Sequence, residues 1–123
     1  MSVAILHQGD VLIASVQSDL SDTQVLAFRD DVAERIGRYR ARGIVVDVGA
    51  LEVIDSFVAR SLRAIAITAQ LRGAQTIVVG IQPDVAIAMV HFDLNLEPLR
   101  TALDLDEALE ALARLPEGEE DGR

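Results

Sequence analysis

The sequence repeats one unit that strongly limits the possible folds: an amphipathic helical segment, an Arg-Gly pair, and a short run of β-branched residues. The first unit leads from Gly43 into Ile44–Val48, and the second leads from Gly73 into Thr76–Val79. In both units we expect the glycine to end the helix and the apolar run to form a strand buried on both faces. Consecutive units of this kind form parallel strands with right-handed helical crossovers, so the sequence predicts an α/β fold.

Turn and cap residues place the remaining elements. A Gly-Asp pair at positions 9–10 joins the apolar segments Val3–Leu6 and Val11–Val16 as a β-hairpin. Helices are expected to begin at Ser21, where Gln24 completes a capping box, at Ser56, at Pro83 and at Asp104. The third of these helices is expected to run through the apolar residues Val85, Met89 and Phe92, and a short edge strand around Pro98 is expected within Asn95–Thr101. We therefore predict a mixed, mostly parallel β-sheet that starts with a β-hairpin and is covered by about four helices.

Length and composition favour one domain that contacts other proteins. Residues 1–115 are assigned to a single domain, and residues 116–123 to an acidic tail that we expect to be flexible. The chain has no cysteine for a disulfide or a thiolate metal site. It also has no apolar segment near the ~20 residues that span a bilayer, so a cytoplasmic location is expected. The net charge of −9, with arginine as the only basic residue type, disfavours nucleic acid and favours a basic protein partner.

The sequence gives little support for catalysis, and no cofactor is expected. No glycine loop with phosphate-binding spacing is present. Asp47 and Asp55 follow apolar residues near a strand's carboxyl end, where α/β sheets place their sites, and two such carboxylates are able to bind Mg²⁺. Receiver-type sites add a lysine, which the chain lacks. We therefore favour structural roles, in which Asp47 accepts backbone hydrogen bonds and Asp55 caps the next helix, and keep magnesium-dependent phosphoryl transfer as a remote alternative.

Ser56 stands where an extended segment becomes a helix, directly after Asp55. As an N-cap, its hydroxyl would accept a backbone N–H bond worth roughly 1 kcal/mol. The position also suits a phosphate, because free amides and the helix dipole at a helix N-terminus attract negative charge. Phosphorylation adds about −1.5 to −2 charges, so Ser56 is a candidate for a binding switch that needs no chemistry from the protein itself.

Four segments resemble the STAS domains of anti-sigma factor antagonists. They are Val46–Val48, Leu51–Val58, Gly80–Pro83 and Thr101–Leu105. The resemblance extends over nearly the whole chain apart from the acidic tail. Stand-alone antagonists usually have Asp-Ser-Ser-Gly where this chain has Asp55-Ser56-Phe57-Val58, which favours the RsbS-type scaffold subunits of the bacterial stressosome.

The resemblance implies a protein-binding scaffold that regulates the general stress response. Such a subunit assembles with RsbR-type STAS paralogues, holds an RsbT-type serine kinase, and releases the kinase when a serine, here Ser56, is phosphorylated. An RsbX-type phosphatase resets the switch. We assign Asp55 and Phe57 to support of this phosphorylation site, and Asp19, Asp47 and Pro83 to a partner-binding surface.

The expected assembly includes homodimers, because the chain should bury part of its aliphatic surface. Two further interpretations stay open. A stand-alone anti-sigma factor antagonist would bind an anti-sigma kinase without forming a large assembly. The STAS portion of an anion transporter is disfavoured, since the sequence lacks a membrane segment.

Overall fold

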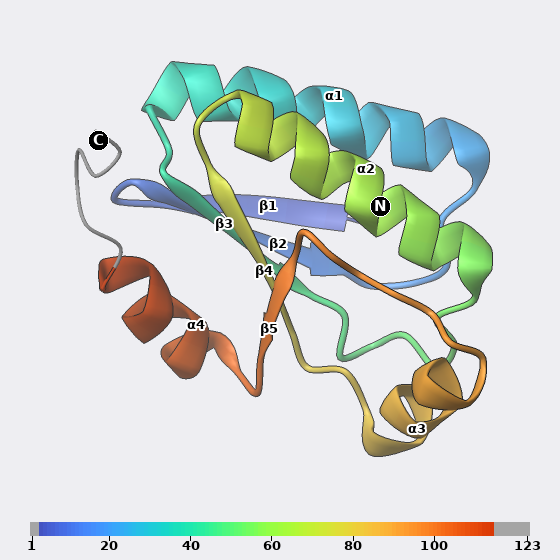
Figure 1. Ribbon diagram of the computed structural model, residues 1–123. Helices are drawn as coiled ribbons and strands as arrows, with labels where there is room; N and C mark the ends of the chain where they lie inside the picture. Colours follow the sequence, from blue (N-terminus) through green and yellow to red (C-terminus); the bar gives the residue numbers. More distant parts are fainter. Residues whose placement is uncertain (1–2, 115–123) are drawn as a thin grey trace.

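The computed structural model describes residues 3–114 as a five-stranded sheet with four helices, in the strand order β1-β2-β3-β4-β5 (Figure 1). In chain order the elements are β1 (Val3–Gln8), β2 (Val11–Val16), α1 (Asp22–Tyr39), β3 (Gly43–Asp47), α2 (Ser56–Leu71), β4 (Gln75–Val79), α3 (Pro83–His91), β5 (Arg100–Ala102) and α4 (Leu105–Ala113). β1 pairs with β2 antiparallel, and every other neighbouring pair is parallel. The predicted mixed, mostly parallel α/β sheet is confirmed. The predicted acidic tail, residues 116–123, lies outside the described residues.

The two faces of the sheet are covered by different helices. α1 and α2 lie on one face and α4 lies on the other, while α3 sits beyond one end of the strands (Figure 1). Ile44 and Val46 point into the larger cluster with α1 and α2, and Val45 between them points into the smaller cluster with α4. All three side chains are fully buried, so β3 is covered on both faces as its apolar run predicts.

Local signals place the hairpin and the helix starts as expected. Gly9 takes a φ of 62° at the first position of the turn between β1 and β2, where a type II′ turn needs glycine. At the start of α1, the Ser21 hydroxyl accepts a bond from the Gln24 amide at 3.2 Å, and the Gln24 side chain accepts one from the Ser21 amide at 2.9 Å. Pro83 is the first residue of α3, and Asp104 caps α4.

Three expectations need correction. Gly43 does not end a helix: α1 ends at Tyr39, and Arg40 takes the left-handed conformation at φ 52°. Gly43 is instead the first residue of β3. The edge strand is Arg100–Ala102 and not centred on Pro98, because the chain from residue 95 to 99 turns inward to bury Leu96 and Leu99 before pairing with β4. The third helix, which we expected to run through Phe92, ends at His91, and Phe92 is its C-cap with a side chain that is 69% exposed.

No helix within residues 3–114 combines the length and the apolar character that crossing a membrane requires.

Candidate functional site

The predicted site residues gather where β3 and β4 end. Both strands run in the same direction, so their carboxyl ends lie side by side and the segments that follow them leave the sheet at the same end. Residues 48–55 lead from β3 to the start of α2, and residues 80–82 lead from β4 to the start of α3. The N-terminus of α2 and the whole of α3 therefore lie at one end of the molecule (Figure 1).

Asp55, not Ser56, caps α2. Asp55 has an extended backbone, and its carboxylate accepts a hydrogen bond from the Val58 amide at 2.9 Å. Its carbonyl oxygen accepts the first helical bond, from the Ala59 amide at 2.9 Å. The helix-capping role that we favoured for Asp55 is confirmed. The N-cap role for Ser56 is wrong by one position, because Asp and Ser are both good caps and only one residue at this junction is extended.

Ser56 has an exposed hydroxyl that plays no part in capping α2. As the first residue of α2, it has helical geometry and an exposed side chain. Its hydroxyl makes no hydrogen bond to any residue in the range 3–114. In the first helical turn the Val58 amide donates to the Asp55 carboxylate, whereas the amides of Ser56 and Phe57 have no intrahelical partner. An anion attached to this hydroxyl would meet a favourable end of the helix dipole.

The segment that carries Asp55 is anchored to the sheet at its other end. The Asp47 carboxylate accepts a hydrogen bond from the Gly49 amide at 2.8 Å, which confirms the structural role that we favoured for Asp47. The Gly49 carbonyl accepts a bond from the side-chain amide of Gln82, also at 2.8 Å. The Val48 amide extends the ladder by donating to the Val79 carbonyl at 3.0 Å. The loop that positions Ser56 is therefore tied to β3 and to the start of α3.

A close backbone approach completes this anchor. Gly80 takes a φ of 82°, and a Cβ atom on it would lie 2.9 Å from Asp47 Oδ1 and 3.2 Å from the Gly49 amide nitrogen. A residue with a side chain would force these atoms apart. The glycine therefore lets the loops after β3 and β4 lie in direct contact.

Ser56 opens onto a groove between the start of α2 and α3. The groove has a volume of about 470 Å³ and is lined by Glu52, Val53, Ile54, Asp55, Ser56, Asp84, Val85, Ala88, Phe92 and Leu94. Its apolar lining includes Val53 and Phe92, whose side chains are 61% and 69% exposed. Carboxylates of Glu52, Asp55 and Asp84 stand among these apolar groups. An apolar centre with an acidic rim suits a protein partner that brings an apolar side chain and a basic surround.

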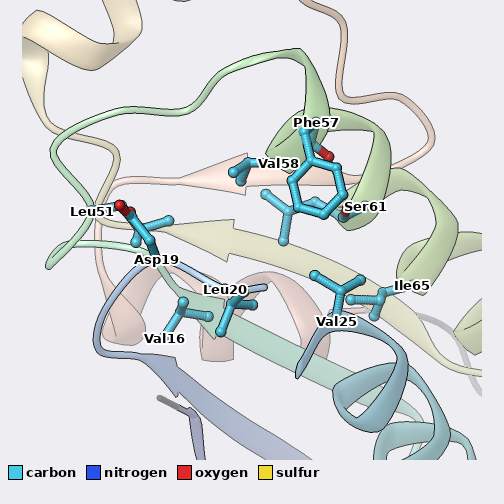
Figure 2. A pocket seen from close by; sticks show the side chains of 10 residues that line it. Val16, Asp19, Leu20, Val25, Leu51, Phe57, Val58, Ser61 and Ile65 are labelled. Carbon is cyan, nitrogen blue, oxygen red and sulfur yellow. The ribbon is translucent and has the colours of Figure 1, made fainter. Parts of the chain in front are cut away.

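Phe57 points away from this groove. It lines a small apolar cavity of about 20 Å³ together with Val58, Leu51 and Asp19, and Figure 2 shows its ring at one end of the cavity and Asp19 at the other. It also lines the shallow groove between α1 and α2. Ser56 and Phe57 therefore occupy separate surfaces, although they are neighbours in the chain.

The predicted partner surface is only partly brought together. Pro83 is exposed at the start of α3, next to the groove residue Asp84. Asp47 lies at the end of β3 with its carboxylate engaged by Gly49, and Asp19 lies on the side of the molecule that carries Phe57. The Ser56 groove therefore includes neither Asp19 nor Asp47 among its lining residues.

Sequence reasoning missed the contribution of α3. The outward residues Ile87 and Val90 are 69% and 82% exposed, so this helix presents apolar side chains to solvent. A surface helix normally carries polar residues on its outer face. The signal in the sequence is the uninterrupted apolar character of residues 85–90, which leaves no polar outer face for a surface helix.

The carboxylates do not gather into a metal site. Within residues 3–114, no three histidine, cysteine, aspartate or glutamate residues lie close enough together to hold a metal ion. Asp47 and Asp55 each accept a bond from a backbone amide of their own loop or helix. The described residues therefore supply no third side-chain ligand for a Mg²⁺ site at Asp47 and Asp55.

Comparison with known proteins places the fold. The STAS-domain family matches residues 2–108. The chain is similar to RsbS of Moorella thermoacetica, solved as a variant with glutamate in place of a serine: 34% identity, 94% of this chain, 100% of that chain and a TM-score of 0.75. It is also similar to a chain in the molecular architecture of the stressosome, a signal integration and transduction hub: 34% identity, 91% of this chain, 100% of that chain and a TM-score of 0.70.

More distant likeness is limited to the fold. Unphosphorylated SpoIIAA, an anti-sigma factor antagonist, shares 12% identity over 92% of this chain and 99% of its own, with a TM-score of 0.66. No curated protein sequence gives a significant match.

Proposed function

The chain belongs to the STAS-domain family, and we propose that within it the protein is a non-enzymatic scaffold of the RsbS type that is switched by phosphorylation of Ser56. In this proposal the unmodified protein holds an RsbT-type serine kinase and releases it once Ser56 carries a phosphate. The observation that carries the proposal is the exposed, uncommitted hydroxyl of Ser56 beside the acidic-rimmed groove. The 34% identity to RsbS over the full length of that protein supports the same function.

The geometry at Ser56 explains why a phosphate would alter binding and leave the fold intact. Asp55 supplies the cap, so modification of Ser56 removes no hydrogen bond that holds the helix. The phosphate adds about −1.5 to −2 charges next to free helical amides that are able to accommodate them. A partner seated in the groove would have to desolvate this group. A loss of about 3 kcal/mol of binding free energy would weaken the complex by more than a hundredfold.

The proposed partners follow from the same family assignment. RsbR-type paralogues would join the chain in a larger assembly, and an RsbX-type phosphatase would remove the phosphate. The similarity to a chain of the stressosome supports the assembly role. Particle size after mixing with an RsbR-type paralogue separates this proposal from a stand-alone antagonist, which would form only small complexes.

The test is phosphorylation by the cognate switch kinase with Mg-ATP, followed by mass spectrometry of the intact protein and its peptides. We expect a single phosphate on Ser56 and release of the kinase from the modified protein. Ser56→Ala should take up no phosphate and retain the kinase. Ser61→Ala is the matched control, because the Ser61 hydroxyl on the same helix already donates to the Phe57 carbonyl at 2.7 Å. A phosphate on another serine, or a kinase that stays bound to the Ser56-phosphorylated protein, contradicts the proposal.

A further inference from the structure

A second groove lies on the outer side of the two helices that cover one face of the sheet. α1 and α2 pack against each other and run in the same direction (Figure 1). Towards their N-terminal ends they enclose a groove with a volume of about 390 Å³, here called the α1/α2 groove. Its apolar lining includes Val25 and Leu26 of α1 and Phe57 and Ala64 of α2. It shares no lining residue with the groove beside Ser56, so the two are separate surfaces.

The walls of the α1/α2 groove have the spacing of a helix–helix contact. On α2, Phe57, Ala64 and Ile67 follow one another at steps of seven and three, which keeps them on one side of the helix. Ile67 is 45% exposed and Leu26 on α1 is 50% exposed, although a surface helix normally has polar residues on its outer side. The groove between two packed helices accepts the side-chain ridge of a third helix. This surface therefore suits a helix with a stripe of apolar residues.

The charge of this surface is opposite to the charge of the whole chain. The chain has a net charge of −9, yet α2 contains the two arginines Arg60 and Arg63 and no aspartate or glutamate. In the α1/α2 groove, Arg29 and Arg60 stand against a single acid, Asp22. A partner that complements this groove therefore carries carboxylates beside its apolar residues.

Both arginines of the groove are free to bind a carboxylate of a partner. Arg60 is exposed, and its side chain forms no ion pair or hydrogen bond with any residue from 3 to 114. Arg29 bonds to its neighbour Asp30 at 2.9 Å, but both side chains are well exposed. An exposed ion pair of this kind is worth little, so Arg29 can exchange Asp30 for another carboxylate at small cost.

We infer that the α1/α2 groove binds an amphipathic helix of another protein, with its apolar residues on Leu26 and Ala64 and its carboxylates on Arg29 and Arg60. This partner has the opposite charge to a partner of the groove beside Ser56, whose rim is acidic. The chain would then hold two proteins of different charge on separate surfaces. The inference goes beyond the proposed function and uses no residue of the Ser56 groove.

The first experiment measures binding of a labelled helical peptide to the full chain by fluorescence anisotropy. The peptide has about 18 residues, or five helical turns, with a leucine stripe flanked by glutamates. We expect it to bind, and we expect Arg60→Glu to weaken binding at least tenfold. Arg114→Glu is the matched control, because it changes the net charge equally at an exposed arginine that ends α4, on the other face of the sheet. Absence of binding to the wild type, or an equal loss in both variants, would overturn the inference.

A second pair of variants tests the apolar part of the groove without changing its charge. Ala64→Gln fills the groove with a longer neutral side chain and should also weaken the peptide at least tenfold. Ala113→Gln, at an exposed alanine of α4, should leave binding unchanged. Circular dichroism checks that all variants fold. Unchanged binding to folded Ala64→Gln would show that the peptide lies elsewhere and would overturn the inference.

The inference and the proposed function fail separately. Phosphorylation of Ser56 is measured without the peptide, and Ala64→Gln and Arg114→Glu leave the groove beside Ser56 as it is. A protein that takes up phosphate on Ser56 and binds no acidic helix would retain the proposed switch and lose only the second surface.

Discussion

The side chain of Leu112 lies directly over the backbone of Gly43. A Cβ atom on Gly43 would come within 2.7 Å of both methyl groups of Leu112. Leu112 is the last inward residue of α4, and it is almost fully buried. The glycine at the start of β3 therefore makes room for the helix that covers this face of the sheet.

Gly43→Ala should destabilise the protein by about 1–3 kcal/mol, because the added methyl group overpacks a buried contact. Urea denaturation monitored by circular dichroism measures this loss. In the double variant with Leu112→Ala the overpacking is relieved, so the Gly43→Ala penalty should fall well below its value in the wild-type background. An additive double variant would mean that the two residues do not interact in the way described.

The helix cap gives a prediction that distinguishes two neighbouring residues. Asp55→Ala should lower the free energy of unfolding by about 1 kcal/mol, because it removes the acceptor for the Val58 amide. Asp55→Asn keeps an acceptor oxygen and should stay close to wild type. Ser56→Ala removes no hydrogen bond within the described residues and should change stability by less than about 0.5 kcal/mol. If Ser56→Ala were the more damaging change, Asp55 would not be the cap.

The anchor between the two loops can be tested at two glycines with similar backbone geometry. Gly80 and Gly73 have φ values of 82° and 91°, so alanine is strained at both. Only at Gly80 would the new Cβ atom also meet neighbouring atoms, those of Asp47 and Gly49. We expect Gly80→Ala to lower the thermal unfolding midpoint clearly more than Gly73→Ala. Equal shifts would show that left-handed strain alone accounts for the effect.

The groove beside Ser56 gives a prediction for the proposed kinase complex. Phe92→Ala removes an exposed aromatic group from the groove and should weaken kinase binding at least tenfold, measured by calorimetry with unphosphorylated protein. Protein stability should change little, since Phe92 is 69% exposed. Leu71→Ala provides the control, because it removes a similarly exposed apolar side chain at the far end of α2. Equal affinities for both variants would place the kinase elsewhere.

The fold could be predicted from sequence wherever the cause is local. The hairpin turn at Gly9 and the capping box of Ser21 and Gln24 depend on residues close together in the chain, and both are observed. The role of Gly43 could not be predicted in this way. Its reason is a contact with Leu112, and that neighbour is defined only once α4 has packed on the sheet.

The candidate site was predictable in position but not in detail. Asp55 and Ser56 are both good caps, so local chemistry alone did not decide which of them holds the helix. The groove was missed because it forms between segments that follow different strands. Its residues Val53 and Phe92 become neighbours through the parallel pairing of β3 with β4, which their own surroundings in the sequence do not show.

Because Asp55 caps α2 and Ser56 does not, residue 56 can be replaced with little loss of stability. Ser56→Ala and Ser56→Glu should therefore yield equally well-folded subunits. The alanine variant stays unphosphorylated, and the glutamate variant imitates the negative charge of the phosphorylated form. If the two variants are mixed in chosen proportions, the amount of kinase that an assembly releases can be measured as a function of the fraction of subunits that carry glutamate at position 56. A graded response and a threshold response could then be told apart without a kinase or phosphatase in the sample.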